Sequence, residues 1–352
     1  MGTLTSLLVL SFLIFFHELG HFLAARFFGV RVEVFSIGFG KKIFSKVVGH
    51  TEYCISLIPL GGYVQMKGQN DMDPLAISHD SDSYNTKHPW KRIIILFAGP
   101  FANFLLAFLL YIIIAFNGVT FLAPIIGSVM ENSPASQAGF LANDKILAIN
   151  DTKVTTWNDL QKTIQRTKES LVFEVQREQK VLRMVVVPKL LENKSIFGET
   201  IYKPMIGIGS SREIITLHFS TIESLSYAYE QTLASSLFVL ESFQKLLEGV
   251  IPVKELGGII TIVKVTTDAS NAGIIALFTL TALISVNLGV LNLLPIPALD
   301  GGHMMFNTYE LITRKAPSES VLRYMTMGGW MILLSLMILS IFNDLYRMTG
   351  GQ

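Results

Sequence analysis

An apolar segment near the start of the chain is long enough to cross a membrane, yet it carries a glutamate and two histidines. Residues 4–16 contain no charged side chain, and the apolar run resumes at Phe22 after the sequence His17-Glu18-Leu19-Gly20-His21. A helix of about 20 apolar residues spans a bilayer. Ionisable side chains are costly at that depth, so here they indicate a functional site.

The spacing of these residues is that of an H-E-x-x-H motif. His17 and His21 are four residues apart, so on a helix they project from one face. Two imidazoles can occupy two corners of a tetrahedral zinc site, and Glu18 is then placed to polarise a water in an open corner. The motif predicts Zn²⁺ as the cofactor and Glu18 as the catalytic carboxylate.

The composition is that of a membrane protein. Half of the 352 residues are hydrophobic and 16% are charged, and the mean hydropathy is +0.48. The net charge of +1 argues against a nucleic-acid partner. A single cysteine, Cys54, excludes an intramolecular disulfide and a cysteine-rich zinc site. Any metal must therefore be held by histidines and carboxylates.

Four segments are long and apolar enough to be transmembrane helices, namely residues 4–28, 93–116, 273–294 and 325–342. The first resembles a signal peptide, but no basic residue precedes it and no clean cleavage site follows, so we expect it to be retained. Basic residues concentrate between spans one and two and between spans three and four. The positive-inside rule then places both connections in the cytoplasm and both termini outside.

Residues 220–249 form an additional long helix that begins with a capping-box pattern at Ser220. Its centre is apolar enough to suggest a fifth span, but Glu230, Glu241 and Lys245 make it amphipathic. We expect it to lie on the membrane surface in contact with lipid.

The connection after the first span is too apolar for an ordinary solvated loop. Residues 30–66 alternate with period two and contain several glycines, which predicts short β-strands. A small cytoplasmic sheet is one interpretation. A hairpin that enters the membrane beside the metal is the one we favour, with its backbone covered by protein. Residues 68–90 are polar, and His79 and His88 are expected to be exposed loop histidines.

The long segment between spans two and three begins with a β-rich domain. Strands are predicted at residues 125–130, 145–150, 171–177 and 181–187, with a helix at 157–166 capped by Thr156. The domain contains no Ser/His/Asp or Cys/His set, so we expect a binding or gating module. The predicted organisation is 1–29 (first span), 30–90 (β element and loop), 91–118 (second span), 119–190 (β-rich domain), 191–271 (connecting segment), 272–303 (third span) and 304–352 (cytoplasmic connection and fourth span).

The third span ends in a sequence that cannot remain helical. Pro295 and Pro297 open the backbone, which is tolerated at membrane depth where it lines a buried cavity. Asp300 follows, and a carboxylate is the missing third ligand of a two-histidine zinc site. Alternatively, Asp300 simply ends a helix, and His303 is either a rival ligand or an interfacial histidine. Asn292 contacts either substrate or an opened turn of its own helix.

Together, the H-E-L-G-H sequence at residues 17–21 and the N-L-L-P-I-P-A-L-D-G sequence at residues 292–301 resemble the site-2 protease family of intramembrane zinc metalloproteases. The resemblance covers essentially the whole chain. Within it, the β-rich domain looks like a PDZ domain, as in the bacterial branch similar to the regulator-of-sigma-E protease. Residues 99–103 look like the family's G-x-x-x-N packing motif, and Gly38-Phe39-Gly40 lies where that branch has a re-entrant β element.

Two features depart from that branch: a single PDZ-like domain is present where better-known relatives have two, and Gly257-Gly258 replaces a frequent Gly-Pro.

The resemblance implies a fold and an activity. The fold is an α-helical polytopic membrane protein with four transmembrane helices, a re-entrant β element on the cytoplasmic side and an inserted PDZ domain. The activity is cleavage within the transmembrane segments of single-span membrane proteins, such as an anti-sigma factor or a remnant signal peptide. The location is the bacterial cytoplasmic membrane, with the PDZ-like domain outside and the active site near the cytoplasmic side.

The residues expected to contact substrate lie in the two motif-bearing regions. A sheet edge within residues 30–66 offers an unwound substrate a place as an added strand, and the opened backbone of the third span holds its other side. The predicted contact residues are Gly38, Gly40, Tyr63, Asn292, Pro295 and Pro297.

Two other functions remain open from the sequence. One is a membrane-anchored peptide-binding scaffold with a non-catalytic metal site. The other is a metal-ion transporter, which the near absence of further ionisable residues in the spans disfavours. Only a protease requires Glu18 in addition to the ligands.

Overall fold

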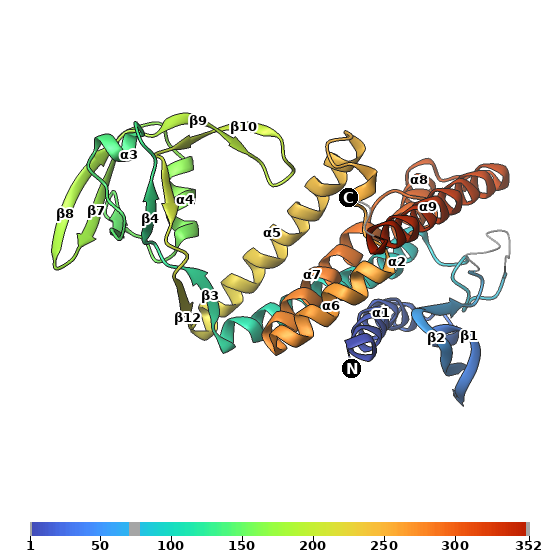
Figure 1. Cartoon of the computed structure of the whole chain (residues 1–352). Helices are drawn as coiled ribbons and strands as arrows, with labels where there is room; N and C mark the ends of the chain where they lie inside the picture. The colour runs from blue at the N-terminus through green and yellow to red at the C-terminus, as the bar shows by residue number, and fades with distance from the viewer. Residues whose placement is uncertain (1, 70–77, 350–352) are drawn as a thin grey trace. The chain divides into compact units, whose positions relative to one another are not determined.

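The computed structural model describes residues 2–69 and 78–349, so Asp71 and Asp73 of the predicted polar loop lie outside the described residues. The chain divides into two compact units (Figure 1). One unit comprises Met1–Ile114 with Ile222–Gln352, and the other comprises Ala115–Thr221.

The first unit is mainly helical. Among the described residues, four helices are long and apolar enough to cross a membrane: α1 (Gly2–Phe27), α2 (Pro89–Asn117), α7 (Ile274–Asn292) and α9 (Glu319–Met348). They coincide with the four predicted spans, so the prediction of a multi-pass membrane protein is confirmed. Helix α5 (Thr221–Leu247) forms where a long helix was predicted, but it does not combine the apolarity and low charge of the other four.

A long β-hairpin follows α1 in place of the several short strands that the sequence predicts. Strands β1 (Val32–Val48) and β2 (Thr51–Met66) pair antiparallel, with repeated shifts of register. Gly38 and Gly40 have φ values of 90° and 84°. Glycine adopts such angles without steric cost, so β1 bends through these positions and continues where a strand of other residues would end.

Two helices of the first unit were not predicted. Helix α6 (Ile259–Ala272) lies in the expected connecting segment and has 14 residues, so at 1.5 Å per residue it is about 21 Å long, too short to cross a bilayer. It packs on α1, where the Ser6 hydroxyl donates to the Val263 carbonyl at 3.1 Å. Helix α8 (Asp300–Thr313) begins directly after the break that the prolines predict.

A buried carboxylate of α9 holds the start of α6. Asp344 is 2% exposed, and it accepts hydrogen bonds from the backbone N–H groups of Gly258, Ile260 and Thr261 at 2.9–3.1 Å. The first N–H groups of a helix have no partner within the helix, and Asp344 supplies partners for three of them.

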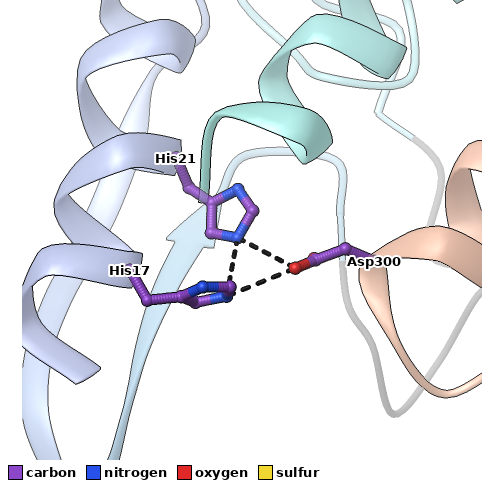
Figure 2. A group of neighbouring side chains, drawn as sticks. All are labelled: His17, His21 and Asp300. Atoms are coloured by element: carbon purple, nitrogen blue, oxygen red, sulfur yellow. Dashed lines mark hydrogen bonds and ion pairs between the residues drawn. The ribbon is translucent and has the colours of Figure 1, made fainter. Parts of the chain in front are cut away.

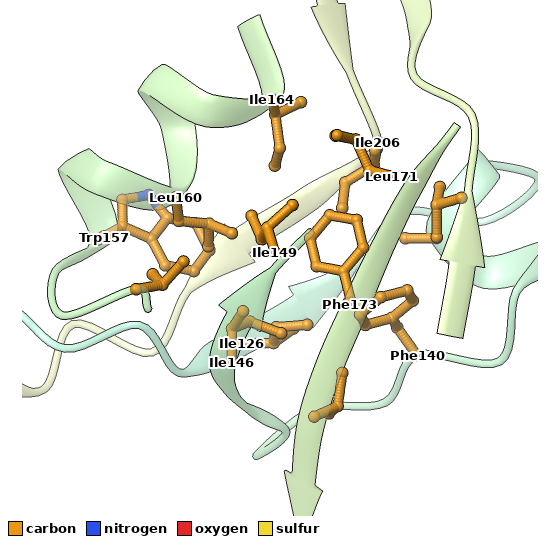
Figure 3. Packing of buried hydrophobic residues seen from close by; sticks show 14 residues of the cluster. Ile126, Phe140, Ile146, Ile149, Trp157, Leu160, Ile164, Leu171, Phe173 and Ile206 are labelled. Atoms are coloured by element: carbon orange, nitrogen blue, oxygen red, sulfur yellow. The ribbon is translucent and has the colours of Figure 1, made fainter. Parts of the chain in front are cut away.

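The second unit is a β-rich domain around one apolar core (Figure 3). Its main sheet is antiparallel with the order β6-β5-β7-β8, formed by β5 (Lys145–Ile149), β6 (Thr152–Lys153), β7 (Leu171–Arg177) and β8 (Lys180–Val186). Helix α4 (Trp157–Gln165) begins at Thr156 with a complete capping box, as the sequence predicts. Asn150 and Asp151 form the β5–β6 turn with positive φ, as two-residue hairpin turns require.

This domain extends beyond the predicted boundary at residue 190. Its remaining elements before that boundary are β3 (Val119–Leu122), β4 (Ile126–Val129) and a short helix, α3 (Pro134–Gln137). Strand β9 (Lys189–Lys194) crosses the boundary, and β10 (Thr200–Met205), β11 (Ile208–Ser210) and β12 (Ile214–Leu217) lie beyond it. Strand β11 pairs with β4, and β12 pairs with β3. Ile206, just before β11, is buried in the core. Because these pairings join the two ends of the domain, local sequence patterns do not reveal them.

A buried ion pair stabilises the β-rich domain and generates a prediction. The Asp144 side chain is fully buried and receives two hydrogen bonds from Arg177 at 2.7 and 2.8 Å. Burial opposes ionisation of Asp144, but Arg177 and the Leu141 N–H outweigh it and hold its pKa below the ordinary value. Asp144→Asn should destabilise this domain by about 2 kcal/mol. Limited proteolysis of the full-length protein in detergent, read at cleavage sites within Ala115–Thr221, measures the change.

The sign of the pH dependence follows from the lowered pKa. The ion pair contributes its full stability above the unfolded pKa of about 3.9, and this contribution is lost as the pH falls through the lower folded-state value. Protease sensitivity of the domain should therefore rise below about pH 4, and rise less in Asp144→Asn. Glu174→Gln, which removes an exposed pair with Arg183, is the control. Equal protease sensitivity of Asp144→Asn and Glu174→Gln would contradict the prediction.

Candidate metal centre

The metal centre depends on a close crossing of α1 and α2. Gly20 of α1 faces α2 so closely that an added Cβ would collide with the Ala98 carbonyl and lie 2.9 Å from Ala102 Cβ. An added Cβ on Gly99 of α2 would overlap the His21 imidazole. The glycines of the two sequence motifs therefore let the backbone of α2 contact the metal-binding face of α1.

Asp300 comes to the same place from the break after α7. Helix α7 ends at Asn292, residues 293–299 are not helical, and Asp300 is the first residue of α8. Its Oδ2 lies 3.2 Å from His17 Nε2 and 3.4 Å from His21 Nε2, and the two Nε2 atoms are 3.2 Å apart (Figure 2). The three side chains thus converge on one point from two helices that are almost 280 residues apart in sequence.

The donor set fits zinc. Each of the three residues offers one ligand atom, and all of these atoms lie within 4.8 Å of one another. Two imidazoles and one carboxylate are a ligand set of catalytic zinc sites, which leave a fourth position open. His21 Nδ1 lies 2.9 Å from the Ile95 carbonyl oxygen. As the donor in this bond, Nδ1 carries the ring proton and leaves Nε2 free to bind metal.

Asn103 of α2 plays the corresponding part for His17. It is fully buried, and its amide nitrogen lies 3.2 Å from His17 Nδ1. Its amide oxygen is buried and has no hydrogen-bond partner among the described residues. When His17 binds metal through Nε2, its Nδ1 bears the proton. A half-turn of the amide exchanges oxygen and nitrogen, and the Asn103 oxygen would then accept a hydrogen bond from the His17 Nδ1–H group.

A cavity of about 150 Å³ opens beside the three ligands. Of the residues predicted to act on substrate, Glu18, Tyr63 and Asn292 line it. The residues that line it and that the sequence did not single out are Gly62, Val64, Met66, Gln69 and Leu96. The cavity is therefore built from α1, α2, α7, α8 and the β-hairpin.

The structure does not bring all predicted contact residues into this cavity. Gly38, Gly40, Pro295 and Pro297 are not among its lining residues. The two glycines bend β1, and the two prolines lie in the non-helical stretch before Asp300. His303 lies one helical turn beyond Asp300 and packs on Phe306. It is not part of the group of potential ligands found among the described residues.

A multi-pass membrane protein with a two-histidine, one-carboxylate zinc centre and a glutamate beside it is a membrane metalloprotease by fold and site. Comparison with known families agrees. The model of peptidase family M50 matches residues 5–336, so the chain belongs to this family of site-2 proteases, whose metal is zinc.

Proteins named "Putative zinc metalloprotease" match the chain over nearly their whole length. One from Campylobacter jejuni is 45% identical over 99% of this chain and 94% of the relative. One from Helicobacter pylori strain J99 is 37% identical over 98% of this chain and 99% of the relative. One from Rickettsia conorii is 33% identical over 97% and 98%, respectively.

The contact between Asn103 and His17 was not predicted, because residues 99–103 suggested only helix packing. A lone amide in an otherwise apolar span was the available signal, since a polar group at that depth needs a partner. Nothing in the sequence indicated the contact of Ile95, because its backbone carbonyl, and not its side chain, contacts His21.

Asn103 generates the second prediction. Asn103→Leu, which keeps the size but removes the acceptor, should weaken zinc binding by about tenfold, as loss of a hydrogen bond to a ligand histidine typically does. Asn103→Asp keeps an acceptor and should bind zinc more tightly than the Leu variant. Competition with a chromophoric chelator in detergent measures the affinity.

Ser285→Ala is the matched control. The Ser285 hydroxyl donates to the backbone carbonyl of Asn103 at 2.8 Å, so this variant alters the same helix contact without touching His17. Unchanged zinc affinity in Asn103→Leu, or an equal loss in Ser285→Ala, would contradict a role of the amide in orienting His17.

Proposed function

We propose that the protein hydrolyses peptide bonds within the transmembrane segments of single-span membrane proteins. The observation that carries this proposal is the position of the cavity. His17, Glu18 and His21 lie within α1, and Asn292 ends α7, so the polar centre is set among helices that are apolar enough to cross a membrane.

The chemistry divides between the metal and Glu18. Bound zinc supplies Lewis-acid chemistry, polarising a peptide carbonyl and making water more acidic. Glu18 lines the same cavity as the ligands, and its carboxylate accepts the proton that the attacking water loses. It then returns this proton to the nitrogen of the departing amine, so that one carboxylate serves as base and then as acid.

The substrate must be extended before it is cut, because the carbonyls of a helix are engaged in its own hydrogen bonds. The two-stranded β1–β2 sheet offers an edge to which an unwound segment adds as a strand. Tyr63 of β2 and Asn292 face the segment in the cavity, while Gly38, Gly40, Pro295 and Pro297 shape the backbones that hold it. The hairpin acts from within the membrane, as a re-entrant element.

The β-rich domain acts as a PDZ-type module that restricts access to the site. The basic connections favour an orientation with this domain and both termini outside the bacterial inner membrane and the metal near the cytoplasmic side. Substrates whose outer part has already been trimmed then reach the site. An anti-sigma factor and a remnant signal peptide both fit this class of regulated intramembrane proteolysis.

Substitution of Glu18 tests the proposal. Glu18→Gln should retain zinc at the wild-type ratio, because Glu18 is not one of the three ligands, and cleavage should fall about 10²- to 10⁴-fold, the contribution of a general base. Zinc is measured by atomic absorption. Cleavage is measured as accumulation of uncut single-span proteins in membranes of cells that carry the variant, by quantitative proteomics.

Glu241→Gln, on α5 and away from the cavity, is the control. Wild-type levels of cleavage in Glu18→Gln would refute the mechanism. A scaffold or a metal-ion transporter would keep its function in that variant, because both require the ligands only.

A further inference from the structure

Gln69, three residues beyond the end of β2, brings an amide into the catalytic cavity. Three neutral polar side chains of the described residues line this cavity, namely Tyr63, Gln69 and Asn292. The sequence indicated Tyr63 and Asn292 as substrate contacts, but not Gln69. The Gln69 side chain is partly buried, and it belongs neither to the three metal ligands nor to the proton transfer by Glu18. It is therefore a polar group that a molecule entering the cavity meets.

The turn that leads to this amide is fastened to the segment before α2. The Lys67 ammonium lies 2.7 Å from a carboxylate oxygen of Asp80 and 2.7 Å from one of Asp82. The Lys67 backbone N–H donates to the Arg31 carbonyl at 2.9 Å, and the Lys67 carbonyl accepts from the Tyr84 N–H at 2.8 Å. Both the side chain and the backbone of Lys67 therefore hold the turn in place.

Gly68 lets the chain pass close to that segment. It has a φ of 73°, which glycine adopts without steric cost, and an added Cβ would overlap the Asn85 side chain. The Gln69 N–H then donates to the Met66 carbonyl at 3.0 Å. The backbone of Gln69 is thus fixed beside the end of β2, and a side chain supported in this way presents its polar group in a preorganised position.

Gln69 also follows the open edge of the β-hairpin. Residues 62–66 of β2 pair with residues 32–37 of β1, and among the described residues they have a partner strand on this side only. Four of these five residues, namely Gly62, Tyr63, Val64 and Met66, line the catalytic cavity. A strand rises about 3.4 Å per residue, so a segment added along this edge runs for about 14 Å and then reaches Gln69.

Strand addition by itself does not decide which peptide bond of the added segment lies at the metal. Its hydrogen bonds involve the backbone only, and their pattern repeats every two residues whatever the sequence. Register is weakly specified in strands that are rich in glycine, and Gly61 and Gly62 lie at this edge. A fixed side chain at the end of the edge supplies the missing reference point. An amide suits this role, because it both donates and accepts hydrogen bonds, as a peptide group does.

We propose that Gln69 hydrogen-bonds one peptide group of the unwound substrate where it leaves the β2 edge, and thereby sets which peptide bond lies at the metal. This inference rests on the proteolytic function proposed above. Val64, Met66 and Leu96 make part of the cavity wall apolar, and a peptide group without a hydrogen bond is costly in such surroundings. The Gln69 amide removes this cost in one register of the substrate and not in the others.

Binding of a peptide tests the inference without the need for cleavage. The probe is a synthetic single-span peptide with a fluorescent label and a Leu/Ala segment of about 20 residues. Two central glycines mark the place where its helix opens most easily. The peptide is titrated with the full-length Glu18→Gln protein in detergent micelles. Addition of Gln69→Leu should raise the peptide's Kd about fivefold, through the loss of one hydrogen bond.

Gln65→Leu is the matched control. It makes the same chemical change on β2, four residues before Gln69, at an exposed position outside the cavity lining. The Kd of this variant should equal that of the parent Glu18→Gln protein. Zinc content reports whether each variant is folded. An equal Kd in Gln69→Leu and Gln65→Leu would overturn the inference.

A scan of the peptide backbone identifies the bonded group. Each peptide bond around the two glycines is replaced in turn by an ester, which lacks the N–H donor and has a weaker acceptor oxygen. At the position that Gln69 bonds, the ester should raise the Kd of the parent protein but change that of the Gln69→Leu variant far less. Equal effects on both proteins at every position would overturn the inference, because an indirect effect of Gln69→Leu would not depend on the position of the ester.

The position of the cut tests the register in protein that retains Glu18. Mass spectrometry of the products should show one main cut for the wild type and for Gln65→Leu. For Gln69→Leu it should also show cuts at neighbouring peptide bonds. A single unchanged cut in Gln69→Leu would overturn the role of Gln69 in register.

These results separate the inference from the proposed activity. If the Glu18→Gln protein does not bind the peptide, or the wild type does not cut it, the proposed function fails. If binding and cleavage occur and Gln69→Leu behaves like Gln65→Leu, only the inference on Gln69 fails.

Discussion

The close contact between α1 and α2 is the constraint on which the metal centre depends. Gly20 and Gly99 remove the side chains that would hold the two helices apart, and α2 then contacts both histidines. The Ile95 carbonyl bonds to His21, and the Asn103 amide faces His17. Packing between membrane helices is favoured by small residues in just this way. A methyl group at either glycine would displace the groups that orient the ligands.

Several polar groups within the membrane-spanning unit have hydrogen-bond partners on distant elements, and an unsatisfied polar group in hydrocarbon costs several kcal/mol. Asp344 accepts hydrogen bonds from the first N–H groups of α6, and Ser285 bonds to the backbone of α2. The break between α7 and α8 also gives a polar side chain its partners, because the opened backbone places Asp300 beside the two histidines. These bonds join helices distant in sequence, so they also fix the frame around the site.

The sequence by itself determined the four apolar spans, the proline break and the three residues that converge as potential metal ligands, because apolar length, proline and H-E-x-x-H are local signals of strong physical constraints. It also determined β5, α4, β7 and β8, whose alternation and capping are local. Only the tertiary structure decided that the β-rich domain continues to Thr221, since β11 and β12 pair with strands about 80 residues earlier or more. It alone showed α6 held by Asp344 and Asn103 beside His17. Each of these depends on contacts between distant residues, which no local pattern encodes.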